Sequence, residues 1–254
     1  MKNITGKKTL IGWSPYLSNY NYEDTRYLEV LTDKPRNVNP IEYVSGDIMY
    51  CPALCALYKN VYAIKLPYKI ILTTDIYGKL TAETTPDMVK NNIKKIVNIT
   101  KTDRGYNVQI LCQNLFVSDK PYTILETLPP ILHGCRNEIT YLNGAFDCHA
   151  WQRPIQFSFF VSDSIINSNM KNNSIVFDKG EVVMYVKFNT SNDSVTELHQ
   201  LSPKDVDGIS KHILRNMSIN ENIKGFNFIE IINRVRYRRP KKFLTELNYG
   251  KEKK

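Results

Sequence analysis

Short runs of β-branched and aromatic residues, separated by turn-forming residues, fill the middle of the chain from about residue 60 to residue 201. Such runs predict strands, and their regular spacing favours antiparallel sheets. Strand and helix patterns do not alternate, so a doubly wound nucleotide-binding sheet is not expected. We predict a mainly β fold, an antiparallel β-sandwich or barrel. A jelly-roll or cupin-like arrangement fits the same pattern, because strand number and alternation are alike in sandwiches and barrels.

Two of these runs carry the clearest patterns. Residues 155–161 alternate, with every second side chain large and apolar, which is typical of a strand with one buried face. Residues 174–177 and 181–188 flank the turn-forming residues 178–180 and predict a hairpin. The remaining strands are expected at residues 61–66, 68–74, 93–99, 106–116, 122–128 and 195–201, with 93–99 and 106–116 paired as a second hairpin.

Helical signals are confined to two places. Residues 51–58 have helical spacing, with Pro52 in the first turn. Ser202 and Pro203 begin a second helix, whose apolar face is formed by Ile209, His212, Ile213 and Met217. The chain is therefore divided into a Tyr- and Pro-rich N-terminal arm (1–47), a β-rich core domain (48–201), a C-terminal amphipathic helical segment (202–233) and a basic tail (234–254).

The charge of the chain is concentrated at its end. The 254 residues carry a net charge of +9, of which the tail alone carries +7, so the rest of the chain is nearly neutral. A basic tail on a neutral body suggests an appendage that contacts something acidic. Aromatic residues are interleaved with these cations, so nucleic acid is one candidate partner and an acidic protein surface is another.

Several classes of protein do not fit the sequence. No apolar stretch approaches the roughly 18 residues of a membrane-spanning helix, and no apolar segment of a signal peptide follows the charged N-terminus. The five cysteines are an odd number without framework spacing, which suits reduced thiols. Neither glycine-rich phosphate-binding motif is present. We expect no cofactor.

A metal site is the main enzymatic alternative. In a cupin-like barrel, Asp147 and His149 would lie on one strand face and could bind a metal together with His133 or His199. The usual His-x-Asp or His-x-His cue is missing, and a polar loop before the core strand accounts for the same residues. A zinc site at the cysteines is not indicated, because their spacing does not match a zinc knuckle.

A ligand site is the third hypothesis. Trp151 and Arg153 come directly before the alternating strand, and the guanidinium could bind a small anion. A structural role, in which Trp151 closes one end of the sandwich, explains the same residues.

Three short motifs, taken in order, resemble uncharacterised proteins encoded by large tailed phages of marine and cyanobacterial hosts. The motifs are Cys51-Pro52-Ala53 with the following residues 59–62 and 65–68, then Trp151-x-Arg153-Pro154, and finally residues 179–188. The resemblance implies a viral gene. Together with the missing signal peptide, it leads us to expect a location in the host cytoplasm or the virion. It implies no activity and no site residues.

Together these features favour a non-enzymatic phage-encoded binding protein, a structural or accessory component of the virion or its assembly. Its partners would be other phage proteins, host proteins or further copies of the chain, and no membrane is expected. The contact residues would be Tyr16, Tyr20 and Tyr22 of the arm, together with Arg234, Arg236, Arg238, Arg239, Lys241 and Lys242 of the tail. The metal-dependent enzyme and the module that binds small anions or nucleic acid stay as alternatives.

Overall fold

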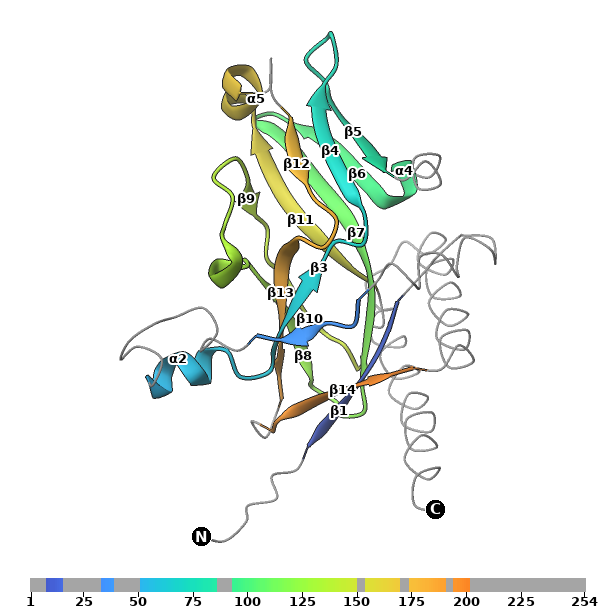
Figure 1. The fold of residues 1–254 in the computed structure, drawn as a ribbon, viewed down its shortest axis with the longest axis vertical. Helices are drawn as coiled ribbons and strands as arrows, with labels where there is room; N and C mark the ends of the chain where they lie inside the picture. Colours follow the sequence, from blue (N-terminus) through green and yellow to red (C-terminus); the bar gives the residue numbers. More distant parts are fainter. Residues whose placement is uncertain are drawn as a thin grey trace, which may run out of the picture.

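The structure is a computed structural model that describes residues 8–15, 33–38, 51–85, 93–149, 154–169, 174–190 and 194–201. Within these residues the fold is mainly β and is built from three sheets (Figure 1). All strand pairs in the described part of the chain but one are antiparallel. The predicted C-terminal helix and basic tail, and the arm tyrosines, lie outside the described residues.

The largest sheet is organised around one long strand, β7 (Gly105–Ser118), which runs along the long axis of the molecule (Figure 1). One edge of β7 pairs first with β6 and then with β1, while the other edge pairs with β11. The other strands of this sheet are β1 (Thr9–Pro15), β6 (Val97–Thr102), β9 (Thr140–Tyr141), β11 (Pro154–Ser162) and β14 (Thr196–Gln200).

Two smaller sheets pack against the large one. The five-stranded sheet contains, in spatial order, β10 (Ala145–Asp147), β8 (Ile124–Leu128), β13 (Val182–Asn189), β3 (Val61–Lys65) and β2 (Arg36–Asn37). The three-stranded sheet contains β12 (Ile175–Phe177), β4 (Lys69–Thr74) and β5 (Leu80–Thr85). Short helical segments are α2 (Pro52–Leu57), α4 (Ile93–Ile96), α5 (Asp163–Asn169) and the 3₁₀ turn η3 (Ile131–His133).

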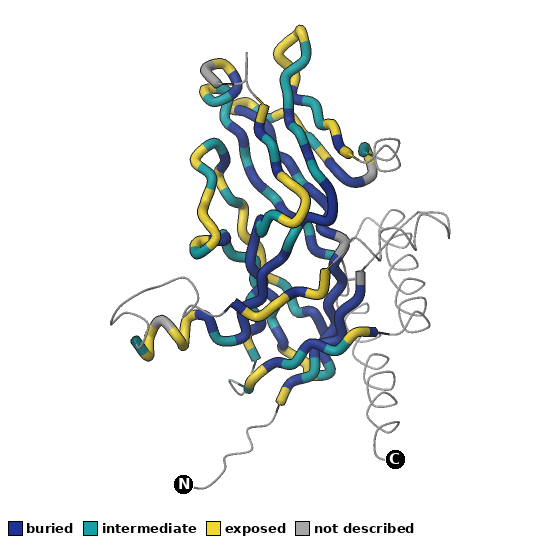
Figure 2. The backbone as a smooth tube through the Cα atoms, viewed as in Figure 1, coloured by how far each residue is buried: buried dark blue, intermediate teal, exposed yellow. Residues whose placement is uncertain are grey.

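One continuous apolar core lies between the sheets, as expected for a sandwich (Figure 2). The inward side chains of β11 alternate as the sequence predicted, and Phe157 and Phe159 of this strand both contact Phe177 of β12, with ring centroids 5.5 and 5.4 Å apart. Aromatic pairs at such distances stabilise a core beyond their buried area. The predicted antiparallel β architecture is confirmed.

The central strands of the five-stranded sheet, β3 and β13, are buried on both faces. The outer face of this sheet carries a second apolar cluster that includes Val61 and Tyr185, and Leu132 of η3 packs on it. The hydroxyl of Tyr185 accepts a hydrogen bond from Leu132 N (3.0 Å) and lies 2.7 Å from His133 Nδ1. Burial on both faces explains why β13 is apolar almost throughout rather than alternating.

The hairpin predicted at residues 174–188 is wrong. β12 pairs with β4 and β13 pairs with β3, so the two strands do not pair with each other. A turn is present, with Glu181 N donating to Asp178 O (3.1 Å), but Leu66 bonds across it to both Gly180 and Glu181. Residues 175–187 therefore run along residues 61–72 as one interrupted ladder, and the turn is a bend within it.

Other local predictions had mixed outcomes. The helix at 51–58 and the hairpin of β6 and β7 are confirmed, although residues 93–96 form a helical turn instead of the start of a strand. No pattern in the sequence indicated β1, β5 or the parallel pairing of β1 with β14.

The gap between the large sheet and the five-stranded sheet is closed by side chains at the free edge of β14. Thr196 N donates to Asn60 Oδ1 (2.9 Å), Tyr62 Oη donates to Thr196 O (2.9 Å), and Lys34 Nζ donates to Leu198 O (2.9 Å). We call this set of bonds the seam. Because the seam satisfies Thr196 N, Thr196 O and Leu198 O, it protects this part of the β14 edge from pairing with another strand.

Candidate binding surfaces

Asp147 and His149, two of the predicted metal ligands, are used to hold a turn. The Asp147 carboxylate accepts hydrogen bonds from Tyr122 N (3.2 Å) and His149 N (2.9 Å), which ties the turn between β7 and β8 to the end of β10. The His149 side chain is only 3% exposed, and its Nδ1 lies 3.0 Å from Ser118 O. Since a carbonyl oxygen only accepts, Nδ1 carries the proton of that bond.

The other two predicted ligands lie elsewhere in the fold. His133 contacts Tyr185 beside the five-stranded sheet, whereas His199 is on β14, with its Nε2 3.4 Å from Glu197 Oε1. Over the described ranges there is no group of three or more His, Cys, Asp or Glu residues that could hold a metal ion. The structure therefore does not bring the predicted ligands together.

The cysteines differ sharply in environment. Cys112 and Cys148 are buried in the core, while Cys55 and Cys135 are exposed. Burial raises the pKa of the Cys112 thiol from its ordinary value of 9.0 to about 12, because the thiolate would lose its hydration. Burial also raises the pKa of Cys148, and the Coulombic repulsion from Asp147 adds to this. Cys112 and Cys148 therefore act as small apolar residues of the core.

The remaining predicted contact and ligand residues lie outside the described part of the chain. They are Tyr16, Tyr20 and Tyr22, Trp151 and Arg153, and Arg234, Arg236, Arg238, Arg239, Lys241 and Lys242.

Helix α2 is an exposed element without a polar side chain. It projects sideways from the body, and its described side chains are all exposed (Figures 1 and 2). Leu57, the largest of these, is 55% exposed. The signal in the sequence was that the predicted helix at 51–58 is apolar throughout. The local sequence pattern alone did not connect this helix to binding. Among the described helices, none is long and apolar enough to cross a membrane.

The tip of the β4–β5 hairpin is the second exposed apolar feature. It projects from one end of the molecule (Figures 1 and 2). The adjacent residues Ile76 and Tyr77 in its turn are 91% and 87% exposed. Asp75 stabilises the turn, because its Oδ1 accepts hydrogen bonds from Tyr77 N (2.9 Å) and Lys79 N (2.8 Å). The signal in the sequence was two large apolar residues inside a turn bounded by Asp75 and Gly78.

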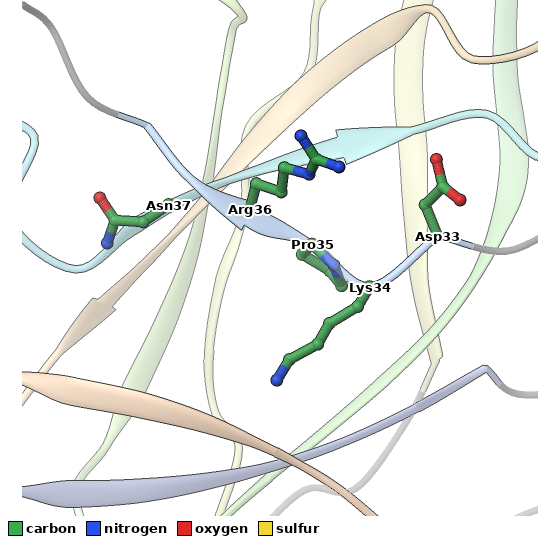
Figure 3. Close-up of a pocket in the computed structure, with 5 residues that line it drawn as sticks. All are labelled: Asp33, Lys34, Pro35, Arg36 and Asn37. Carbon is green, nitrogen blue, oxygen red and sulfur yellow. The ribbon is translucent and has the colours of Figure 1, made fainter.

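An open hollow of about 430 Å³ lies at the edge strand β2, lined by residues 33–37. Figure 3 shows Asp33 and Arg36 on one side of the strand and Lys34 directed away from them, toward β1 and β14. Lys34 belongs to the seam, and Asp33 Oδ2 lies 3.8 Å from Lys65 Nζ. The Arg36 side chain is exposed and forms no hydrogen bond or ion pair with any residue in the described ranges.

Comparisons of the chain with protein-family models, with curated proteins and with solved structures found no match.

Proposed function

We propose that the protein acts by binding other proteins, as a structural or accessory component of a phage particle or of its assembly. The observation that carries this proposal is helix α2, an uncharged apolar helix that stands exposed beside a well-packed β body. Apolar surface of this kind is costly to leave in water and is typical of contact sites. The basic tail adds a second attachment for an acidic protein or for nucleic acid.

Substitution in α2 tests this function. We expect Leu57→Glu to lower incorporation of the protein into purified phage particles by tenfold or more, as measured by quantitative mass spectrometry, because a carboxylate would have to be buried in the contact. Leu142→Glu is the matched control, since Leu142 is 43% exposed on the body. Absence of the wild-type protein from particles and from assembly intermediates would contradict the proposal, and so would normal incorporation of Leu57→Glu.

A second candidate function is binding of a small anion in the hollow at β2. It is supported by the exposed guanidinium of Arg36 beside that hollow. Phosphate or citrate should then raise the thermal unfolding midpoint of the full chain, and Arg36→Ala should remove the shift. Arg104→Ala, on the exposed turn between β6 and β7, is the control. An equal shift of the unfolding midpoint in the wild type, Arg36→Ala and Arg104→Ala would exclude the site.

A further inference from the structure

The tip of the β4–β5 hairpin has a conformation that is fixed before any partner arrives. Besides the two bonds to the Asp75 carboxylate, Gly78 N donates to Asp75 O (2.9 Å) and Asp75 N donates to Lys79 O (2.9 Å). Gly78 has φ +74°, a conformation that glycine adopts without strain. Six consecutive pairs, from Lys69↔Thr85 to Thr74↔Leu80, anchor the turn to the sheet. Ile76 and Tyr77 are therefore presented by a rigid support.

The two side chains contribute nothing visible to the fold itself. At 91% and 87% exposure, Ile76 and Tyr77 pack on almost nothing, whereas the strands on either side of the turn contribute Leu72 and Leu80 to the core. A turn needs only Asp75 and Gly78 for its shape, and polar residues at the two intervening positions would avoid exposing apolar area. Contact with another molecule would account for large apolar residues at these positions.

The charge of the tip indicates which kind of molecule it contacts. Asp75 and Lys79 give the turn one acid and one base, so it has no net charge to attract it to an anionic lipid surface. Two adjacent apolar side chains are also a small area compared with a membrane-binding amphipathic helix. An aliphatic and a tyrosine side chain held on a preorganised turn instead match the anchors that fill pockets on protein surfaces.

We propose that the β4–β5 tip is a docking element, which inserts Ile76 and Tyr77 into an apolar pocket of a partner protein. This inference rests on the proposed function, and it adds a contact at the end of the body, separate from α2. Ile76 and Tyr77 are the contact residues. Asp75 is a positioning residue, since its carboxylate bonds to the backbone of the turn.

Site-specific crosslinking in phage-producing cells tests the proposal with the full chain. The photoreactive residue p-benzoylphenylalanine is placed at position 77, at position 57 in α2, and at position 122 as a control, because Tyr122 is 65% exposed on another turn. We expect one discrete protein adduct from position 77, identified by mass spectrometry, and none from position 122. In cells, the adduct should be lost when Ile76→Ser is added.

The affinity of the purified partner, once identified, supplies the second measurement. We expect Tyr77→Ser and Ile76→Ser each to weaken binding about tenfold or more without changing the unfolding midpoint. Asp75→Ala should weaken binding as well, whereas Asp75→Asn, which keeps the acceptor oxygen, should restore it. A merely structural Asp75 would change the unfolding midpoint and leave the affinity unchanged.

The outcomes separate this inference from the proposed function. A protein adduct from position 57 but none from position 77 overturns the docking tip and leaves the function standing. No adduct from either position overturns both. Binding of the wild-type chain to vesicles of phosphatidylcholine and phosphatidylglycerol, lost with Tyr77→Ser, would show that the tip binds lipid and would overturn the protein pocket.

Discussion

A buried hydrogen bond between Trp13 and Asn114 joins β1 to β7 inside the core. Trp13 Nε1 donates to Asn114 Oδ1 (2.7 Å), and Asn114 Nδ2 donates to Cys112 O (2.6 Å). The asparagine side chain therefore satisfies an indole N–H and a backbone carbonyl that water cannot reach. Since unpaired polar groups in a core are costly, Asn114 is more important for stability than its size suggests.

We expect Asn114→Ala to lower the free energy of unfolding by about 2 kcal/mol, because it leaves the indole N–H without a partner. Asn98→Ala, on the exposed face of β6, is the matched control and should cost less than about 0.5 kcal/mol. Urea unfolding followed by tryptophan fluorescence measures both. Equal losses in the two variants would show that the buried bond is not the cause.

The two classes of cysteine give a second prediction at this scale. A thiol reagent at neutral pH should label Cys55 and Cys135 rapidly in the folded protein and leave Cys112 and Cys148 unlabelled until the chain is unfolded. Labelling of the five thiols is counted by mass spectrometry. Rapid labelling of Cys112 in the folded state would contradict its burial.

The raised pKa values also predict how stability depends on pH. Above pH 9.0 the thiols of the unfolded chain lose protons, whereas Cys112 keeps its proton in the folded protein up to about pH 12. The folded state then binds more protons than the unfolded state, so the free energy of unfolding falls as the pH rises above 9.0. Cys112→Ala should make this decline shallower between pH 8 and pH 10, as measured by urea unfolding.

At the scale of elements, the loop that follows β8 is fastened to the bend between β12 and β13. Arg136 Nε donates to Glu181 Oε1 (2.9 Å) and Nη2 donates to Glu181 Oε2 (2.9 Å). Nη2 also donates to Val176 O (2.6 Å), and the guanidinium lies 4.6 Å from the centroid of the Phe177 ring. A planar guanidinium can bond to the carboxylate and the carbonyl and stack on the aromatic ring at the same time. The loop is thereby held over the point where the interrupted ladder bends.

We expect Arg136→Ala to destabilise the protein by about 2 kcal/mol, because it removes a charge-assisted bidentate pair and leaves Val176 O unbonded. Lys101→Ala removes the same charge from the exposed pair Lys101–Asp163 and should cost about 0.5 kcal/mol. Hydrogen exchange at residues 131–136 should accelerate only in Arg136→Ala. Unchanged exchange there would mean that other contacts, such as the hydrogen bonds to the Tyr185 and Tyr141 hydroxyls, are enough to hold the loop.

Comparison of particular elements shows what sequence can predict. β11 was predicted correctly because one face is buried and the other is partly open, which leaves an alternating pattern. The hairpin at 174–188 was wrong because residues 178–180 are compatible both with a reversal and with a bend, and only the bonds to Leu66 distinguish them. β5 was missed because four of the six residues in its sequence, LTAETT, are polar.

The candidate site was less predictable than the fold. Exposure of α2 and of the Ile76–Tyr77 turn depends on what else packs nearby, which a local pattern does not contain. Asp147 and His149 were singled out by residue type, yet their partners are backbone groups of a distant turn. The Arg36 hollow depends on the pairing of a two-residue strand with β3, and no local pattern predicts that pairing.

For the whole molecule, the seam joins the large sheet to the five-stranded sheet beside the apolar core that they share. Asn60 is central to it, since Oδ1 accepts from Thr196 N (2.9 Å) and Nδ2 donates to Ser194 O (2.8 Å). Asn60 also has φ +59°, a conformation that asparagine and aspartate tolerate better than other residues with a side chain. An aspartate can therefore replace it without a new backbone strain.

We expect Asn60→Asp to lower the free energy of unfolding by about 2 kcal/mol or more, because a buried carboxylate oxygen would face the Ser194 carbonyl in place of a donor. Asn37→Asp introduces the same charge at an exposed position of β2 and serves as the control. Hydrogen exchange in residues 196–200 should accelerate in Asn60→Asp alone. Protection of these amides as in the wild type would show that the seam does not hold β14.

The parallel pairing of β1 with β14 has a consequence for how the chain is made. Residues 9–13 align with residues 196–200, so the ribosome must synthesise almost the whole β body before β1 can gain its outer neighbour. Until then the nascent chain carries β1 either unpaired or with one bare edge, which is the kind of edge that recruits strands from neighbouring polypeptides. Slow translation between residues 120 and 196 should therefore increase aggregation during synthesis, while the finished protein is unaffected.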